Sequence, residues 1–258
     1  MYSTLKLDFQ GKIATLTLNR PEKRNAISHA LIDDFLAALA EVESSPAQVL
    51  ILTGEGKAFS AGMDLEDLKA LVTHTLEENR RHSERIATLF RSLYNFPKTT
   101  IAAVHGPAIA GGTGLATLCD FTLASANATF GYTEVRIGFV PAVVSAFLIR
   151  QVGEKDARDL LLTGRIITAA EAYRMGLVNE VVELTSLMPA ALQLAAQLLE
   201  NSPASLRATK ALLREYGRDS LERDIRIGMA ANASVRMSPD FEEGVRSFLE
   251  RRKPHWSE

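Results

Sequence analysis

The sequence has little of what stabilises a secreted domain or builds a metal centre. Its only cysteine, Cys119, excludes an intrachain disulfide and fits a reducing compartment. The five histidines are scattered, and none stands at metal-ligand spacing from another His or from the cysteine. The start of the chain lacks the basic and then apolar pattern of a signal peptide. We therefore expect a cytoplasmic protein that binds no metal.

Long apolar runs and a surplus of one charge are absent as well. Charges or turn residues interrupt each apolar run before it could span a bilayer, so we expect no membrane partner. The formal net charge of the 258 residues is -2 at pH 7, which gives no overall basic field, and we expect no nucleic-acid partner. Apolar residues make up 47% and charged residues 23%, as in ordinary globular proteins.

Strands and helices alternate through the first part of the chain. Residues Ile13 to Leu18 alternate between apolar and polar, which predicts a half-buried strand. Apolar residues at helical spacing after Ser28 predict a helix with Ser28 as its N-cap. The other expected elements are strands at 49–53, 100–104, 121–124 and 177–182 and helices near 85 and from about 111. This alternation predicts the α/β fold class.

The strand pattern almost vanishes beyond Gly153, and the rest of the chain is mostly helical in pattern. We expect a domain change near residue 195. The prediction is a core domain over 1–195 and a helical region over 196–258.

Two segments share one design, in which a buried strand runs into small residues and then into a helix. They are Phe59–Asp64 and Ala108–Gly114. The first N–H groups of a helix are unpaired, and glycine lets a ligand approach the backbone closely. Two such turns facing each other would form an oxyanion hole. Taken singly, each is equally a tight turn in which glycine serves conformation or packing. A dinucleotide site is disfavoured, because the second loop lacks the third small position and an acidic partner after a second strand.

A set of short motifs resembles the crotonase family, the enoyl-CoA hydratases and isomerases, over essentially the whole chain. The resemblance implies a spiral of strand-strand-helix units and C-terminal helices that form a homotrimer or a dimer of trimers. It also implies an acyl-CoA substrate and no separate cofactor, since coenzyme A belongs to the substrate. The motifs are Asn19-Arg20-Pro21, Asn25-Ala26, Lys57 through Leu65, His105-Gly106-Pro107, Ala110-Gly111-Gly112, Cys119-Asp120, Ala128 through Gly131 and Glu134 through Gly138.

Three catalytic groups follow from this resemblance. The N–H groups of Met63 and Gly111 match the two oxyanion donors of the family, and Glu134 matches one of its catalytic carboxylates. Without the resemblance, Glu134 would be read as a solvated glutamate near Arg136. Apolar neighbours such as Phe139 would raise its pKa and suit it to moving a proton.

One position departs from the two-carboxylate hydratases, which carry a second Glu where this chain has Gly114. Family members resembling methylglutaconyl-CoA hydratase also have glycine there. We therefore expect hydration of an enoyl-CoA, of a branched or carboxylated type, with Gly114 leaving room for substrate or water. Isomerisation between 3-enoyl-CoA and 2-enoyl-CoA by a single Glu is the alternative. A non-catalytic acyl-CoA binding protein is the alternative of another class.

Substrate-binding residues are expected around the two turns and at the C-terminus. The resemblance places Arg24 and Ala26 beside the nucleotide part of coenzyme A and lets Lys253 reach the ligand of a neighbouring subunit. Each cation alone is more commonly a solvated surface charge. Asp64 is expected as a cap or loop residue rather than an acid catalyst. The remaining expected contacts are Ala61, Gly62, Gly112 and Gly114.

Overall fold

The computed structural model describes residues 2–257, and its main sheet has six strands in the order β1-β2-β3-β4-β6-β9. The first pair is antiparallel, and every later pair of neighbours is parallel. Parallel neighbours need crossover connections, and helices lie between β2 and β3, between β3 and β4, and between β4 and β6. The strands span Leu5–Gln10 (β1), Ile13–Leu18 (β2), Val49–Gly54 (β3), Thr99–Val104 (β4), Phe121–Ser125 (β6) and Glu180–Val182 (β9).

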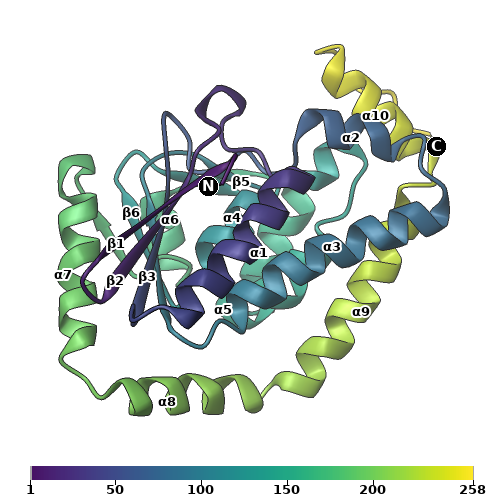
Figure 1. The fold of residues 1–258 in the computed structure, drawn as a ribbon. Coiled ribbons are helices and arrows are strands. Elements are labelled where there is room, and N and C mark those ends of the chain that lie inside the picture. The colour runs from purple at the N-terminus through teal and green to yellow at the C-terminus, as the bar shows by residue number, and fades with distance from the viewer. Residues whose placement is uncertain (1, 258) are drawn as a thin grey trace.

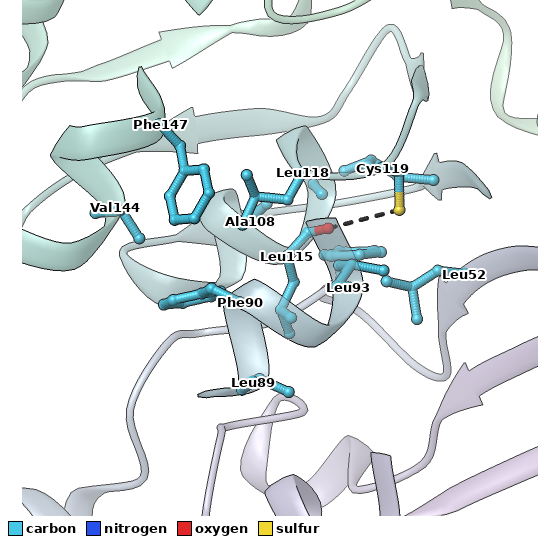
Figure 2. Close-up of a cluster of buried hydrophobic side chains, with 14 of the residues drawn as sticks. Leu52, Leu89, Phe90, Leu93, Ala108, Leu115, Leu118, Cys119, Val144 and Phe147 are labelled. Atoms are coloured by element: carbon cyan, nitrogen blue, oxygen red, sulfur yellow. Dashed lines mark hydrogen bonds between the residues drawn. The ribbon is translucent and has the colours of Figure 1, made fainter. Parts of the chain in front are cut away.

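Alternate residues of the central strands face two different apolar cores. On β3, Leu50 and Leu52 join the larger core, whereas Val49 and Ile51 join the smaller one. Figure 2 shows part of the larger core, with aliphatic and aromatic side chains gathered around helix α4. Burial on both faces explains why these strands read as continuous apolar runs in the sequence.

Helices supply the other side of each core. The larger core receives α1 (His29–Ser44), α3 (Leu76–Tyr94), α4 (Gly111–Thr117), α5 (Ala142–Thr163) and α6 (Ala169–Arg174). The smaller core is built on α7 (Leu187–Leu199). In Figure 1, α7, α8 (Pro203–Glu215) and α9 (Arg218–Val235) follow one another around the outside of the sheet and its helices. Leu221 and Ile225 on the inner side of α9 also join the larger core. Helix α8 has no buried residue, and its Leu212 and Leu213 are more than half exposed in the single chain.

A small second sheet joins β5 (Ala108–Ile109), β7 (Thr129–Gly131) and β8 (Ile166–Thr168). Strand β7 leads directly into the one-turn helix η2 (Glu134–Ile137). Helix α10 (Pro239–Leu249) packs against η2 with almost no space between the two backbones. A Cβ on Gly244 would lie 2.3 Å from the carbonyl oxygen of Ile137. The position of η2 is therefore coupled to the position of α10.

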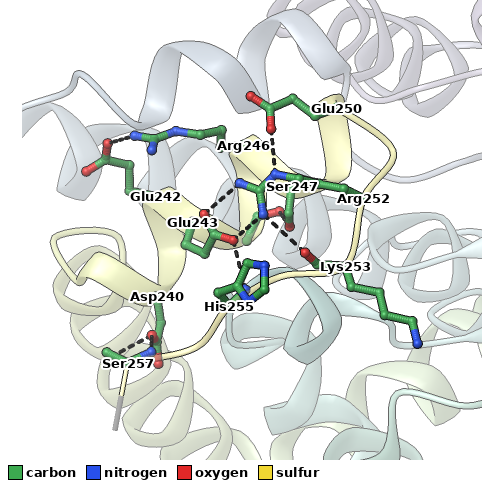
Figure 3. Close-up of polar contacts among 11 residues, drawn as sticks. Asp240, Glu242, Glu243, Arg246, Ser247, Glu250, Arg252, Lys253, His255 and Ser257 are labelled. Carbon is green, nitrogen blue, oxygen red and sulfur yellow. Dashed lines mark hydrogen bonds and ion pairs between the residues drawn. The ribbon is translucent and has the colours of Figure 1, made fainter.

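The end of the chain folds back onto α10 through polar contacts (Figure 3). Arg252 makes a two-pronged ion pair with Glu243, in which Nη2 lies 2.8 Å from Oε2. The N–H of Ser257 donates to the Asp240 carboxylate at 2.9 Å. This fold-back fastens the C-terminal segment to the helix that supports η2.

Most of the predicted elements are confirmed, and with them the α/β class. Ser28 caps α1 by accepting a hydrogen bond from the N–H of Leu31 at 3.3 Å, as expected. Strands β1, β5, β7 and β8 were not predicted, because three of them have two or three residues and β1 is largely exposed. The predicted domain boundary at residue 195 lies inside α7 and stays a prediction. Within residues 2–257, no helix is both long enough and apolar enough to cross a membrane.

Candidate functional site

Four short extended segments lie side by side and bring the predicted catalytic residues into one place. Ile27 pairs with Met63, and Ser60 pairs with Ala108, each in a parallel bridge. Strand β5 then pairs with β7, which ends three residues before Glu134. Residues far apart in the sequence therefore become neighbours through backbone pairing alone.

The N–H of Met63 is held in place but unused. Ile27 donates its N–H to the carbonyl of Gly62 at 2.7 Å, and Asp64 donates its N–H to the carbonyl of Ile27 at 2.9 Å. These two bonds fix the backbone on both sides of Met63. The Met63 N–H itself finds no acceptor within the described residues. A fixed donor without a protein acceptor is available to a ligand oxygen.

The N–H of Gly111 is presented by a strained turn. Ala110 has φ 52° and ψ -122°, a region that residues with a Cβ seldom adopt, at a cost of order 1–3 kcal/mol. Its N–H donates to the carbonyl of Gly131 at 2.7 Å, and its carbonyl accepts from the N–H of Gly114 at 3.2 Å. Gly111 is the first residue of α4, so its N–H has no acceptor within the helix.

The two turns approach each other at Gly62. This residue has φ 82°, and a Cβ on it would lie 3.6 Å from the nitrogen of Gly111 and 2.8 Å from the carbonyl oxygen of Ile109. Any side chain would therefore collide with the second turn. Met63 is the next residue along the chain, so its N–H lies beside this contact. The N–H groups of Met63 and Gly111 are thus on neighbouring segments that glycine allows to touch.

Glu134 is the first residue of η2 and is buried, with 8% of its surface exposed. Burial raises the pKa of its carboxyl from 4.5 to about 7, and a bond from its own backbone N–H opposes this shift. Its Oε2 has no hydrogen-bond partner in the part of the chain that the structure describes. A carboxyl group with a pKa near neutrality and an unused oxygen can both take and return a proton.

Asn25 stabilises the first turn through hydrogen bonds. It is fully buried with φ 54°, and its Oδ1 accepts from the N–H of Arg20 at 2.9 Å. Its Nδ2 donates to the carbonyls of Glu55 and Ala58, each at 2.9 Å. The carbonyl of Asn25 accepts from the hydroxyl of Ser60 at 2.8 Å. One side chain therefore satisfies three backbone groups, of which the carbonyl of Ala58 is buried.

We expect Asn25→Ala to lower the free energy of unfolding by about 3 kcal/mol or more. The change would leave one buried and two partly buried backbone groups without their partners, at about 1–3 kcal/mol for each group that water cannot reach, and would place Ala in a left-handed conformation. Urea unfolding followed by circular dichroism measures this. The exposed Asn201→Ala is the matched control and should change stability by less than about 0.5 kcal/mol. Equal midpoints for the two variants would contradict the role given to Asn25.

Arg20 links the first turn to the segment around Ala26. Its Nη1 donates to the carbonyl of Ala26 at 2.9 Å and lies 2.8 Å from Oδ2 of Asp64. Asp64 also caps α2 (Leu65–Leu71) by accepting from the N–H of Glu66 at 3.0 Å. The expectation that Asp64 is a cap is therefore confirmed, while its contact with substrate stays a prediction.

The other predicted binding residues fall into two groups. Arg24, Ala26, Ala61, Gly62 and Gly112 lie at the two turns, where the N–H of Ala61 donates to the carbonyl of Arg24 at 2.9 Å. A Cβ on Gly112 would lie 2.4 Å from the carbonyl oxygen of Ser60, so this glycine serves the contact between the turns. Lys253 is exposed in the C-terminal segment, and Figure 3 shows its side chain directed away from the Glu243–Arg252 pair. Contacts of these residues with coenzyme A stay predictions.

The space expected beside Gly114 is filled. A Cβ on Gly114 would lie 2.8 Å from Cγ1 of Val144 and 3.2 Å from Cε1 of Phe90. Figure 2 shows both side chains next to α4, in the buried cluster. The expectation that Gly114 leaves room for substrate or water is therefore wrong for this conformation. Glycine supplies no carboxylate at this position, and a larger side chain would require Val144 and Phe90 to shift.

Two further observations concern Arg136 and metal ions. Arg136 is exposed and makes no ion pair among residues 2–257, and its side chain instead packs beside Gly164. No group of three or more His, Cys, Asp or Glu side chains in the described ranges is arranged to hold a metal ion.

Comparison with known proteins gives consistent results over the full chain. A family model described as "Enoyl-CoA hydratase/isomerase" matches residues 8–258. A relative from Thermus thermophilus, assigned in its name to the enoyl-CoA hydratases, is 46% identical over 96% of this chain and 98% of its own length. The 2,3-dehydroadipyl-CoA hydratase of Escherichia coli is 34% identical over 98% of both chains. An enoyl-CoA hydratase/isomerase of Xanthobacter autotrophicus superimposes with a TM-score of 0.89 at 29% identity, covering 98% of both chains.

Proposed function

This chain belongs to the enoyl-CoA hydratase/isomerase family, and from that premise we propose that it adds water across the double bond of an enoyl-CoA thioester. The crotonase-like fold predicted from the sequence is confirmed. The chain is an enzyme that acts on acyl-CoA thioesters.

One observation supports the proposal above the others: a pair of unused N–H groups on touching turns, accompanied by a buried carboxyl group with a pKa near 7. The N–H groups of Met63 and Gly111 would bind the thioester oxygen and stabilise the negative charge that develops on it. Polarisation of the carbonyl makes the β-carbon of the conjugated double bond electrophilic and the α-carbon basic once water has added. Both steps need only one proton carrier.

Glu134 would carry that proton in both directions. Its ionised carboxylate takes a proton from water as the water oxygen bonds to the β-carbon, and the electrons of the double bond move to the thioester oxygen. The protonated Glu134 then returns its proton to the α-carbon, and the carbonyl reforms. The carboxyl group ends in its starting state, so a second carboxylate is not required by the proton balance.

Isomerisation is the second candidate, because one carboxyl group with a pKa near 7 can also move a proton between the two ends of an allyl unit. The names of several relatives favour hydration, among them crotonyl-CoA hydratase and 2,3-dehydroadipyl-CoA hydratase. We propose hydration of a branched or carboxylated enoyl-CoA as the main activity. In a non-catalytic acyl-CoA binding protein, the raised pKa of Glu134 would have no function.

The proposal is tested with three thioesters: 3-methylglutaconyl-CoA, crotonyl-CoA and a 3-enoyl-CoA. Loss of the absorbance of the conjugated thioester reports hydration, and a gain of it reports isomerisation. We expect the first two to be hydrated, with 3-methylglutaconyl-CoA preferred. Turnover of the 3-enoyl-CoA alone would replace hydration by isomerisation. Binding of all three without turnover would favour the non-catalytic alternative.

We also propose that the chain works as a homotrimer or a dimer of trimers in the cytoplasm, with no cofactor beyond the coenzyme A of its substrate. Support for self-association comes from α8, where Leu212, Leu213 and the nearby Tyr216 are between 52% and 75% exposed. Apolar side chains gathered on one element favour contact with another chain. Sedimentation equilibrium distinguishes the three-fold assembly from a monomer.

A further inference from the structure

A buried arginine near the candidate site has no acidic partner. Arg236 is 4% exposed at the C-terminal end of α9, and none of the ion pairs formed by the described residues includes it. The other deeply placed cation, Lys210, pairs with the carboxylate of Asp120. Buried charges are normally paired, because the loss of water around an unpaired charge costs several kcal/mol. An unpaired guanidinium therefore needs an explanation.

Its protein neighbours are neutral and use only one of its nitrogens. Nη1 lies 3.4 Å from the carbonyl of Asn79, 3.2 Å from its Oδ1 and 3.1 Å from Nδ1 of His82. Burial lowers the pKa of His82 to about 3, so this imidazole is neutral and accepts the bond at Nδ1. Nε is buried without a partner, and Nη2 donates to no atom of residues 2–257. One edge of the guanidinium is therefore unused.

The guanidinium of Arg236 is connected to the candidate site by its contact with the ring of Phe139. Its Cζ lies 5.1 Å from the centre of the Phe139 ring. Phe139 follows η2 closely, and its N–H donates to the carbonyl of Glu134 at 3.1 Å. The same ring belongs to an apolar cluster with Leu68 and Leu71, against which the side chain of Met63 packs. This cluster therefore contacts both Met63 and Arg236.

These contacts join a proposed oxyanion donor to an unpaired cation through one buried apolar cluster. An acyl chain whose thioester oxygen is bound at Met63 would run along Leu68, Leu71 and Phe139. A terminal methyl group at the end of such a chain would leave the cation unpaired. A terminal carboxylate would pair with it through the planar, two-pronged geometry that guanidinium and carboxylate share.

We propose that Arg236 binds the terminal carboxylate of the acyl chain, so that the preferred substrates are enoyl-CoA thioesters of dicarboxylic acids. The inference deepens the proposed function by naming its substrate class, and it rests on that function only where turnover is measured. The main rival is a purely structural arginine, held by Asn79, His82 and the Phe139 ring. A structural role would affect all acyl chains alike, whereas carboxylate binding discriminates between them.

The test compares two six-carbon substrates that differ only at the far end, 2,3-dehydroadipyl-CoA and 2-hexenoyl-CoA. We expect the wild type to favour the first in kcat/KM. Arg236→Met keeps an apolar side chain against Phe139 and should lower kcat/KM for 2,3-dehydroadipyl-CoA by roughly 10- to 100-fold, as expected for loss of a charge-assisted hydrogen bond. The value for 2-hexenoyl-CoA should stay unchanged or rise. Arg246→Met, at an exposed arginine of α10, is the matched control and should change neither.

Binding separates this inference from the hydratase proposal. Calorimetry on the wild type with adipyl-CoA and hexanoyl-CoA needs neither turnover nor a folded variant, and adipyl-CoA should bind more tightly. Tighter binding of adipyl-CoA without hydration of either enoyl-CoA would refute hydration and leave the role of Arg236 standing. Equal binding of the two ligands, or an equal loss for both substrates in Arg236→Met, would overturn the role of Arg236 and leave hydration intact.

Discussion

Glu134→Gln is expected to lower kcat by roughly 10²- to 10⁴-fold, the usual contribution of a positioned proton carrier. Glutamine keeps the size and the polarity of the side chain but cannot take a proton from water. The buried position of Glu134 should accept it, because the amide avoids the charge that burial disfavours. KM should change little, since the proposed binding of the thioester oxygen depends on backbone groups. Stopped-flow absorbance with the best substrate of the panel measures both constants.

The pH dependence gives the same residue a second signature. Burial raises the pKa of the Glu134 carboxyl to about 7, and hydration needs its ionised form. The wild-type kcat/KM should therefore rise with pH through about 7 and level off above it. This acidic limb should be missing from the residual activity of Glu134→Gln. If the variant kept an acidic limb with the same midpoint, the titrating group would be one other than Glu134.

Stability should change in the opposite direction to activity. Because the folded pKa lies above the value of 4.5 for a free glutamate, folding favours the protonated form. That stabilisation is complete below about pH 4.5 and is lost as the pH rises through about 7. At pH 8 the wild type should be less stable than Glu134→Gln by about 3 kcal/mol, because a tenfold change in a proton-binding constant corresponds to about 1.4 kcal/mol. Near pH 4.5 the two should unfold alike.

A matched variant checks that these effects belong to the site. Glu66→Gln makes the same chemical change on α2, where the side chain of Glu66 is 69% exposed. It should leave kcat and the pH profile of stability unchanged. Wild-type turnover in Glu134→Gln, or equal losses in the two variants, would remove Glu134 from the mechanism.

The sequence predicted the parts of this fold that depend on local pattern. The buried strands β3 and β4 follow from continuous apolar runs, and the start of α1 follows from Ser28. The second sheet did not follow, because β5 and β7 have two and three residues and are defined by pairing with distant segments. The same reason hides the contacts of Asn25, whose acceptors lie about thirty residues further along the chain. Such residues are recognised by the sequence motif that contains them, not by the periodicity of apolar residues.

The burial of Arg236 could have been predicted from its spacing along α9. The buried residues of α9 include Leu221, Ile225, Gly228 and Asn232, and Arg236 continues the same helical stripe four residues later. A charged residue on the buried stripe of an amphipathic helix is unusual enough to mark a partner that is not visible in the sequence. The missing space beside Gly114 could not be foreseen in this way. It depends on Phe90 and Val144, which come from two other helices.

Gly111→Pro tests the oxyanion donor directly, because a backbone N–H cannot be removed by shortening a side chain. Proline fits the first position of a helix, where the N–H has no partner to lose. The variant should therefore fold, with kcat lowered by roughly 10²- to 10³-fold, the usual cost of removing one preorganised donor. Gly111→Ala is the matched control. It keeps the N–H and adds a carbon 3.1 Å from Cδ1 of Ile27, at the flexible end of that side chain.

The infrared spectrum of bound hexanoyl-CoA separates loss of the donor from simple obstruction by the proline ring. Hydrogen bonds to a carbonyl oxygen weaken the C=O bond, so the thioester stretch should move to lower frequency on binding to the wild type and to Gly111→Ala. It should move less in Gly111→Pro, which would retain only the N–H of Met63. If Gly111→Pro binds the thioester with the full wild-type shift and turns it over normally, Gly111 donates nothing to the reaction. A proline variant that binds no thioester, beside an active Gly111→Ala, would instead show that the ring occupies the place of the oxygen.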